Sequence, residues 1–275
     1  MAEKRFLADM HTHSQYSHDS EAPIEDMCLA QIERGTDAFA VTDHCDILSF
    51  SDYDIFTPIR RSCENVLSLR EKYRGKCEIL TGVEISEGIW RPAENRRIHE
   101  LFPYDVILGS VHCVERNGDW TAFSRLDFSA FSDEEIRTFL GDYFRDELHL
   151  IREMDLDVLC HLTCPVRYIR GKYNREVDLA PFMETIEEIL TEVIRRGKAL
   201  EVNAAGIDHI GETLPGEDVL RLYRSLGGKK ITLASDAHQP RRASQHFEEV
   251  RGMLKEIGFT HALLFRQRKE EAYPL

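Results

Sequence analysis

Histidine is the residue whose distribution in this chain indicates chemistry. The sequence has 12 histidines, and six of them stand where a short apolar run, the pattern of a buried strand, reaches its carboxyl end. Glu84 and Asp236 stand at strand ends as well. Parallel strands converge at one rim of a barrel, so these side chains predict a shared metal site there. The six histidines are His11, His13, His44, His112, His161 and His238.

The local spacing supports a metal site. In the segment from Asp9 to His13, one residue separates the two imidazoles of His11 and His13, and alternate side chains of a strand share a face. Both rings can therefore reach one ion. Asp236 and His238 repeat this spacing with a carboxylate and an imidazole. A mixed set of this kind suits zinc, iron or manganese. The set is too large for one ion but natural for two or three, with Glu84 as a bridge.

Other histidines and cysteines have a plainer interpretation. Cys45, Cys113 and Cys160 each adjoin a proposed ligand, and strand alternation would turn them to the opposite face, so we expect them in the core. The remaining histidines in helix or loop contexts are expected on the surface or in packing roles. They are His99, His149, His209, His246 and His261.

Strands and helices must position these side chains, and the chain alternates between the two. Short apolar runs predict strands at 6–8, 38–41, 78–80, 106–108, 158–159, 199–202 and 231–234, with 262–265 as a candidate for one more. Amphipathic stretches, several beginning at Pro and ending at Gly, predict helices at 24–34, 58–73, 133–154, 181–196, 216–226 and 243–257. This order is typical of parallel β/α units and predicts an α/β fold, a (β/α) barrel. A doubly wound open sheet is the alternative, but no GxGxxG follows the first strand.

Composition narrows the range of functions. The 275 residues carry a net charge of -14, which argues against a broad surface for duplex nucleic acid. A small anionic substrate remains compatible, because metal ions would reverse the charge locally. No run approaches the ~18 apolar residues of a membrane helix, and no signal peptide is recognised, so a cytoplasmic location and free thiols are the expectation. The oligomeric state stays open.

The ordered motifs resemble a known family. The chain is similar to the polymerase and histidinol phosphatase (PHP) superfamily, within it the histidinol-phosphate phosphatase branch, which implies a single domain over 1–275 with a distorted seven-stranded, TIM-like (β/α)7 barrel. The segments ILGSVHCV and CHLTCPVRY favour that branch. The matching segments, in chain order from Asp9 to His238, are DMHTHSQYSHDS, AVTDH, TGVEIS, ILGSVHCV, CHLTCPVRY, ALEVNAAG and ITLASDAH.

The resemblance implies three divalent transition metal ions and assigns their ligands. One ion would take His11, His13, Glu84 and Asp236, a second Glu84, His112 and His161, and a third Asp19, His44 and His238. Asp19, not its neighbour His18, matches the position two residues after the serine of the HxHxxxS pattern, which here is Ser17. The catalytic group implied is a metal-bridging hydroxide held by Glu84, His112, His161 and Asp236.

Arg167 matches an arginine that the family uses against the substrate phosphate. Some members have a second phosphate-binding arginine just after strand six, which has no counterpart here in the segment 203–206. A cation from elsewhere in the chain could compensate for it, and the candidates are Arg116, Arg170, Lys172 and Arg241. Histidinol carries an ammonium and an imidazole, so carboxylates outside the metal ligands should help to bind it. Glu115 and Asp127 are candidates for this role.

The expected activity is hydrolysis of a small phosphomonoester, L-histidinol phosphate, to L-histidinol and phosphate. The alternative is another PHP phosphoesterase activity, on a different small ester or on nucleic acid ends. A non-catalytic metal-binding protein is disfavoured because the whole ligand set is present.

Overall fold

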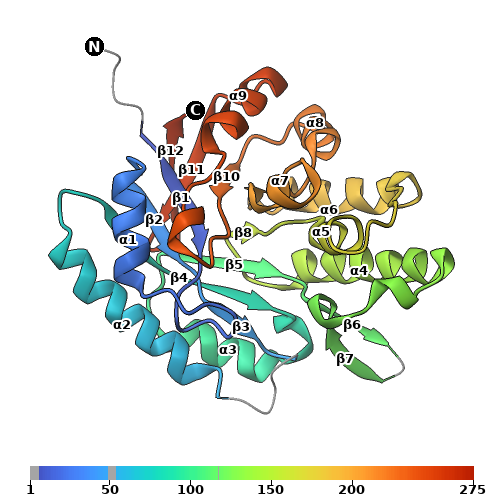
Figure 1. Cartoon of the computed structure of the whole chain (residues 1–275), viewed down its shortest axis with the longest axis horizontal. Coiled ribbons are helices and arrows are strands. Elements are labelled where there is room, and N and C mark those ends of the chain that lie inside the picture. Colours follow the sequence, from blue (N-terminus) through green and yellow to red (C-terminus); the bar gives the residue numbers. More distant parts are fainter. Residues whose placement is uncertain (1–5, 49–53, 117) are drawn as a thin grey trace.

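Seven parallel strands form the centre of the protein in a computed structural model that describes residues 6–48, 54–116 and 118–275. The strands pair in the order β1-β2-β4-β5-β8-β9-β10. Backbone hydrogen bonds from Asp236 N to His11 O (2.9 Å) and from His13 N to Ala237 O (2.9 Å) join the last strand to the first, so the sheet closes as a barrel (Figure 1). The strands are β1 (Ala8–Thr12), β2 (Ala38–Val41), β4 (Glu78–Ser86), β5 (Val106–Ser110), β8 (Val158–Leu159), β9 (Ala199–Asn203) and β10 (Ile231–Ala234).

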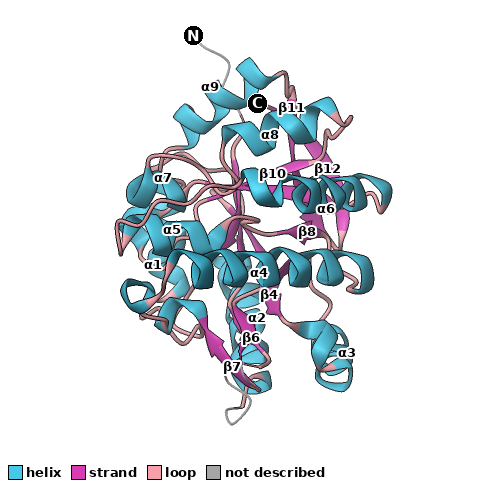
Figure 2. Ribbon diagram, turned by 90° about the vertical axis from the view of Figure 1, so that its right-hand side faces the viewer, coloured by secondary structure: helices cyan, strands magenta, loops and turns pink. Residues whose placement is uncertain are grey.

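Helices surround this barrel (Figure 2). Each long helix turns its apolar side to the sheet, as in α4, whose buried residues include Ile136, Phe139 and Tyr143 at helical spacing. Ser132 is the N-cap of α4, and it forms a reciprocal capping box with Glu135. The helices are α1 (Ile24–Glu33), α2 (Phe56–Lys72), α3 (Pro92–Leu101), α4 (Asp133–Glu153), α5 (Cys164–Gly171), α6 (Met183–Arg195), α7 (Ala205–Ile210), α8 (Glu217–Ser225) and α9 (Phe247–Ile257).

Shorter elements complete the fold outside the barrel. Strand β3 (His44–Asp46) pairs with β4 beside β2. The hairpin β6 (Cys113–Arg116) and β7 (Asp119–Ala122) follows β5, and the hairpin β11 (His261–Arg266) and β12 (Lys269–Pro274) ends the chain. The segment 262–265, a candidate for one more strand of the parallel series, lies in β11 and is antiparallel to β12. It therefore does not extend the barrel.

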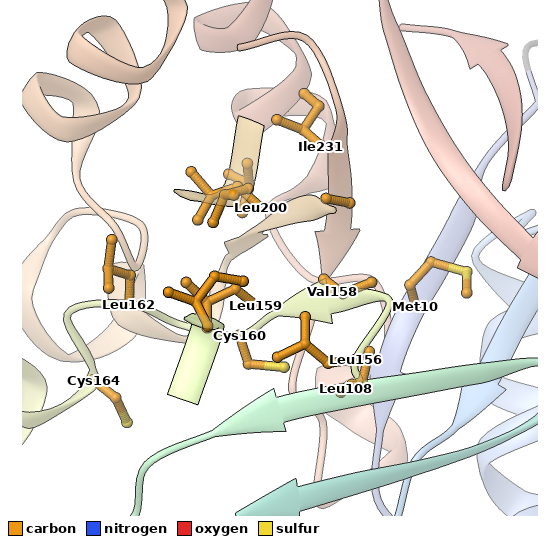
Figure 3. Packing of buried hydrophobic residues seen from close by; sticks show 14 of the residues in the cluster. Met10, Leu108, Leu156, Val158, Leu159, Cys160, Leu162, Cys164, Leu200 and Ile231 are labelled. Atoms are coloured by element: carbon orange, nitrogen blue, oxygen red, sulfur yellow. The ribbon is translucent and has the colours of Figure 1, made fainter. Parts of the chain in front are cut away.

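The core lies inside the barrel and between the barrel and its helices. Met10, Leu108, Val158, Leu200 and Ile231 come from five different strands and are buried together (Figure 3). Apolar layers of this kind fill a parallel barrel and fix the relative positions of its strand ends. The predicted (β/α)7 barrel is confirmed, and the rim at the carboxyl ends of its strands becomes the place to look for chemistry.

Candidate active site

Glu84 lies at the centre of the predicted site. Its side chain projects from β4 and is fully buried, and five imidazole rings from four segments surround its two carboxylate oxygens. The ring nitrogens closest to these oxygens are His161 Nε2 at 2.8 Å, His44 Nδ1 at 2.8 Å, His112 Nε2 at 3.2 Å, His11 Nε2 at 3.4 Å and His13 Nε2 at 3.7 Å. A single ion pair or hydrogen bond would not require so many ring nitrogens around one carboxylate. This arrangement is the one expected of a carboxylate that bridges two metal ions.

The electrostatics of this centre favour an ionised carboxylate. Burial raises the pKa of Glu84, but the neighbouring imidazoles of His112, His11 and His44 outweigh burial and hold the pKa well below its ordinary value. An anion in such a position would attract a cation.

Asp236 forms a second point of convergence. Its Oδ1 lies 3.2 Å from His13 Nε2, 3.6 Å from His238 Nδ1 and 3.8 Å from His11 Nε2. Its φ is 51°, a left-handed conformation that a non-glycine residue adopts only when its surroundings hold it there. Strain of this kind often accompanies a functional role.

Asp19 lies near the third group, as the motif predicts. Its Oδ2 is 3.2 Å from His238 Nε2 and 3.6 Å from His44 Nε2. His18 lies beside the same group: its Nδ1 is 3.8 Å from Asp46 Oδ2, and its ring centroid is 5.0 Å from that of His44. The structure therefore brings a carboxylate oxygen of Asp19 close to a ring nitrogen of both His44 and His238.

The donor set fits metal ions. The buried atoms Glu84 Oε2, His44 Nδ1 and His161 Nδ1 have no hydrogen-bond partner among the described residues, although His44 Nδ1 is only 2.8 Å from Glu84 Oε2. His13, His44 and His238 offer ring nitrogens within 4.8 Å of one another, as do His11 and His13 with a carboxylate oxygen of Asp236. Imidazoles and carboxylates gathered in this way suit zinc, iron or manganese.

Cysteine thiols have a minor place at this rim. Cys45, Cys113 and Cys160 are buried, in agreement with the expected core positions. Cys160 also lies within 4.8 Å of ligand atoms of His11 and Glu84. Burial, and next the charge of Glu201, raise the pKa of Cys160 well above its ordinary value, which disfavours the thiolate form that binds metals.

Buried carboxylates behind the histidines are the residues that sequence reasoning missed. Glu201 Oε2 accepts from His11 Nδ1 at 2.8 Å, and Asp46 Oδ1 accepts from His112 Nδ1 at 3.0 Å. Each fixes the tautomer of a ring whose other nitrogen faces Glu84. The available signal was a carboxylate within or just after a predicted apolar strand, where an unpaired charge would be costly.

Two more buried carboxylates hold the backbone that carries the ligands. Asp43 accepts from Ser14 N at 2.6 Å, from Ser17 Oγ at 2.7 Å and from Ser62 Oγ at 2.5 Å. Asp9 accepts from Ser235 N at 3.0 Å and from Gln31 Nε2 at 2.8 Å. These contacts fasten the loop after β1 and join β1 to β10.

Arg167 lies on helix α5 beside the metal-type donors. Its Nη1 donates to Asp236 Oδ2 at 3.0 Å, and its Nη2 donates to Tyr168 Oη at 3.2 Å. The side chain is 16% exposed, so it faces a cavity and not open solvent. Helix α5 begins three residues after His161, which places this guanidinium next to the rim.

A cavity of about 610 Å³ opens above these residues. Of the four cations suggested to compensate for the missing arginine, Lys172 lines the cavity. Arg125 and Arg242 also line it, although the sequence did not indicate them. Arg116 instead lies over the Phe131 ring, Arg170 pairs with Glu212, and Arg241 bonds Gln239. The segment 204–205 lines the cavity with alanines.

The rest of the cavity wall differs from expectation. Glu115 and Asp127 are both described in the structure and do not line the cavity. Asp127 caps the short helix at 128–130 by accepting from Ser129 N. Asp208 is the acidic residue on the part of the cavity wall that lies away from the histidine cluster. Its carboxylate accepts from Arg242 and from His246 Nε2. His209 and His246, expected on the surface or in packing, line the cavity.

Comparison with known proteins gives one coherent result. A family model described as the PHP domain matches residues 9–205. A probable histidinol-phosphatase of Thermotoga maritima is 29% identical over 262 residues, which are 93% of this chain and 94% of that protein. A crystal structure of histidinol phosphate phosphatase from Lactococcus lactis, complexed with zinc, L-histidinol and phosphate, is 25% identical with a TM-score of 0.80, covering 96% of this chain and 98% of the other.

One negative finding completes the description. In the part of the chain that the structure describes, no helix is long and apolar enough to cross a membrane.

Proposed function

Because this chain belongs to the PHP domain family, we propose that it is a metal-dependent phosphomonoesterase that hydrolyses L-histidinol phosphate to L-histidinol and phosphate. The observation that carries the proposal is Glu84, with five imidazole rings around one buried carboxylate. The relative from Lactococcus lactis, similar along 96% of this chain, holds zinc, L-histidinol and phosphate. These relatives support both the substrate and the use of metal.

The ligands that we assign form three groups, of which the first two share Glu84. His11, His13, Glu84 and Asp236 would hold one ion, Glu84, His112 and His161 a second, and Asp19, His44 and His238 a third. Zinc, iron and manganese all suit these donors. The convergence of the side chains on Glu84, Asp236 and Asp19 supports this grouping.

The ions would supply Lewis acidity, which makes water a nucleophile near neutral pH and offsets negative charge on the phosphoryl oxygens. The protein contributes positions. Glu201 and Asp46 hold the rings of His11 and His112 in the tautomer whose Nε2 faces Glu84. A correct tautomer is needed because only an unprotonated nitrogen can bind a metal.

Arg167 would bind the phosphate group of the substrate. Its guanidinium presents several N–H donors in a plane, a geometry that matches two phosphate oxygens at once. It faces the cavity next to Asp236, 3.0 Å from that carboxylate. The positive charge would stabilise the anionic transition state and would also orient the ester within the cavity.

Phosphate release tests the proposal. The protein, reconstituted with manganese, zinc or iron, is offered L-histidinol phosphate, p-nitrophenyl phosphate, bis-p-nitrophenyl phosphate and single-stranded DNA. We expect a higher kcat/KM for histidinol phosphate than for p-nitrophenyl phosphate, in spite of its poorer leaving group, because of contacts to the histidinol moiety. Equal or lower kcat/KM would remove the histidinol assignment, and cleavage of the diester or of DNA would favour another PHP activity.

A further inference from the structure

The turn that carries His161 has an unusual backbone. His161 follows β8 with a φ of 20°, outside the regions that non-glycine residues favour. Its own N donates to Glu201 Oε1 at 3.2 Å, and its carbonyl accepts from Cys164 N at 2.7 Å. A strained residue keeps its conformation only while its neighbours hold it, so the contacts of the next peptide also matter.

The next peptide is held by a buried pair on α4. Tyr143 and Glu147 lie one helical turn apart, and both side chains are fully buried. The Tyr143 hydroxyl oxygen is 2.8 Å from Glu147 Oε1 and 3.1 Å from the carbonyl oxygen of Leu162. Tyr143 therefore connects Glu147 to the residue that follows His161. The reaction as described above uses neither side chain.

A count of protons gives the state of this pair. The tyrosine hydroxyl has one proton and faces two oxygens, so an ionised Glu147 and the Leu162 carbonyl would compete for it. Glu147 Oε2 is buried with no hydrogen-bond partner among the described residues, a costly position for a charged carboxylate. A protonated Glu147 removes both problems: it donates to Tyr143 Oη, which donates to the Leu162 carbonyl.

The surroundings of Glu147 agree with this state. Burial raises the pKa of Glu147 to about 8, against the opposing effects of the Tyr143 hydrogen bond and the His161 and His112 rings. Among the neighbouring groups, Cys164 acts in the same direction as burial.

We propose that neutral Glu147 and Tyr143 form a positioning pair, which orients the Leu162 carbonyl and thereby holds the His161 imidazole against Glu84. The proposal rests on the proposed function only in taking His161 as a metal ligand. Neither residue touches the substrate. Loss of the pair would let the strained turn relax, and His161 would move away from its place 2.8 Å from Glu84.

Tyr143→Phe tests the pair directly, with Tyr223→Phe as the matched control. Tyr223 is also buried and also donates to a backbone carbonyl, that of Lys230 at 3.0 Å, but it lies on α8 away from the cavity. We expect Tyr143→Phe to release metal to a chelator about tenfold faster than wild type and to lower kcat more than it raises KM. Tyr223→Phe should lower Tm without either effect. Equal behaviour of the two variants would overturn the proposal.

Glu147→Gln tests the neutral state. A glutamine amide keeps a donor toward Tyr143 Oη and carries no charge, so we expect metal retention and kcat close to wild type. Glu147→Leu, which keeps the volume and loses the donor, should resemble Tyr143→Phe. If Glu147→Gln lost metal as fast as Glu147→Leu, the carboxyl group would act as an anion and the proposal would fail.

Metal retention separates this proposal from the substrate assignment. It is measured without any phosphate ester, so a protein that ignored histidinol phosphate would refute the proposed substrate and still report on His161. A crystal structure of Tyr143→Phe gives a second readout. We expect a rotated Leu162 peptide and a longer separation between His161 Nε2 and Glu84 Oε1, and an unchanged turn would overturn the proposal.

Discussion

The ring of His11 is fixed by Glu201: its Nδ1 donates to Glu201 Oε2 at 2.8 Å, and its Nε2 lies 3.4 Å from Glu84 Oε2. This pairing favours the His11 proton on Nδ1 and leaves Nε2 as the ring atom that faces Glu84. Glu201 on strand β9 thus orients a proposed metal ligand on strand β1.

Glu201→Gln should weaken metal binding about tenfold, because the amide can present a donor to His11 and no longer enforces one tautomer. Metal equivalents retained during dialysis measure this effect. Asp157→Asn serves as the control, since Asp157 is buried at the opposite end of the barrel and binds Arg268. It should lower the free energy of unfolding and leave metal retention unchanged; metal loss in both variants would refute a specific role for Glu201.

Glu84→Gln should abolish most activity and lower the bound metal by more than one ion per chain, because this carboxylate is a proposed ligand of two ions. Elemental analysis of protein purified without chelator gives the count, and wild type should contain more than one equivalent. Glu78→Gln is the control, at the start of the same strand and paired with Arg266. A wild-type value near zero after reconstitution would exclude the metal site.

Asp19→Ala should lower metal occupancy and turnover, whereas His18→Ala should remain near wild type. Asp19 Oδ2 lies within 3.6 Å of ring nitrogens of both His44 and His238, whereas His18 Nδ1 lies 3.8 Å from Asp46 Oδ2 and its ring packs beside that of His44. The two neighbours are controls for each other in metal analysis and kinetics. The opposite ranking would show that the ligand is His18.

Arg167→Ala should lower kcat/KM for every phosphomonoester accepted, by about 2 to 4 kcal/mol, the scale for one charged stabiliser of a developing anion. Arg167→Lys should recover part of the loss, because a point charge does not reproduce the planar fork. Metal content should not change in either variant. Unchanged kcat/KM in Arg167→Ala would place the phosphate elsewhere in the cavity.

Stability should depend on pH through Glu147. Burial raises the pKa of Glu147 to about 8 in the folded protein, against an ordinary value of 4.5 for the unfolded chain. The folded state therefore holds more protons between these values, and the contribution of Glu147 to stability falls as the pH rises through this window. Urea unfolding at pH 5 and pH 8 should show a smaller decline for Glu147→Gln than for wild type. Equal declines would contradict the raised pKa.

Apolar periodicity determined the barrel strands where burial is uniform. The runs at 38–41 and 231–234 coincide with β2 and β10, and the helix at 24–34 differs from α1 by one residue. The prediction placed the first strand too early, at 6–8 instead of Ala8–Thr12, because Asp9, His11 and Thr12 interrupt the apolar pattern. Helices α3, α5 and α7 and the β6–β7 hairpin were missed. Of these, α5, α7 and the hairpin are short, and short elements take their conformation from tertiary contacts.

The candidate ligands could be named from the sequence because imidazoles recur at one type of position, the end of a strand, and the fold brings all such positions to one rim. The sequence could not predict how the candidate ligands lie relative to one another. It also could not predict which carboxylates hydrogen-bond to their imidazole rings. Asp9 meets Ser235 and Glu201 meets His11 across about two hundred residues of chain. Local patterns describe a single element, whereas a buried charge is acceptable only with partners that the closed barrel supplies. Tertiary structure alone therefore decided which acids became supports, and which residues line the cavity.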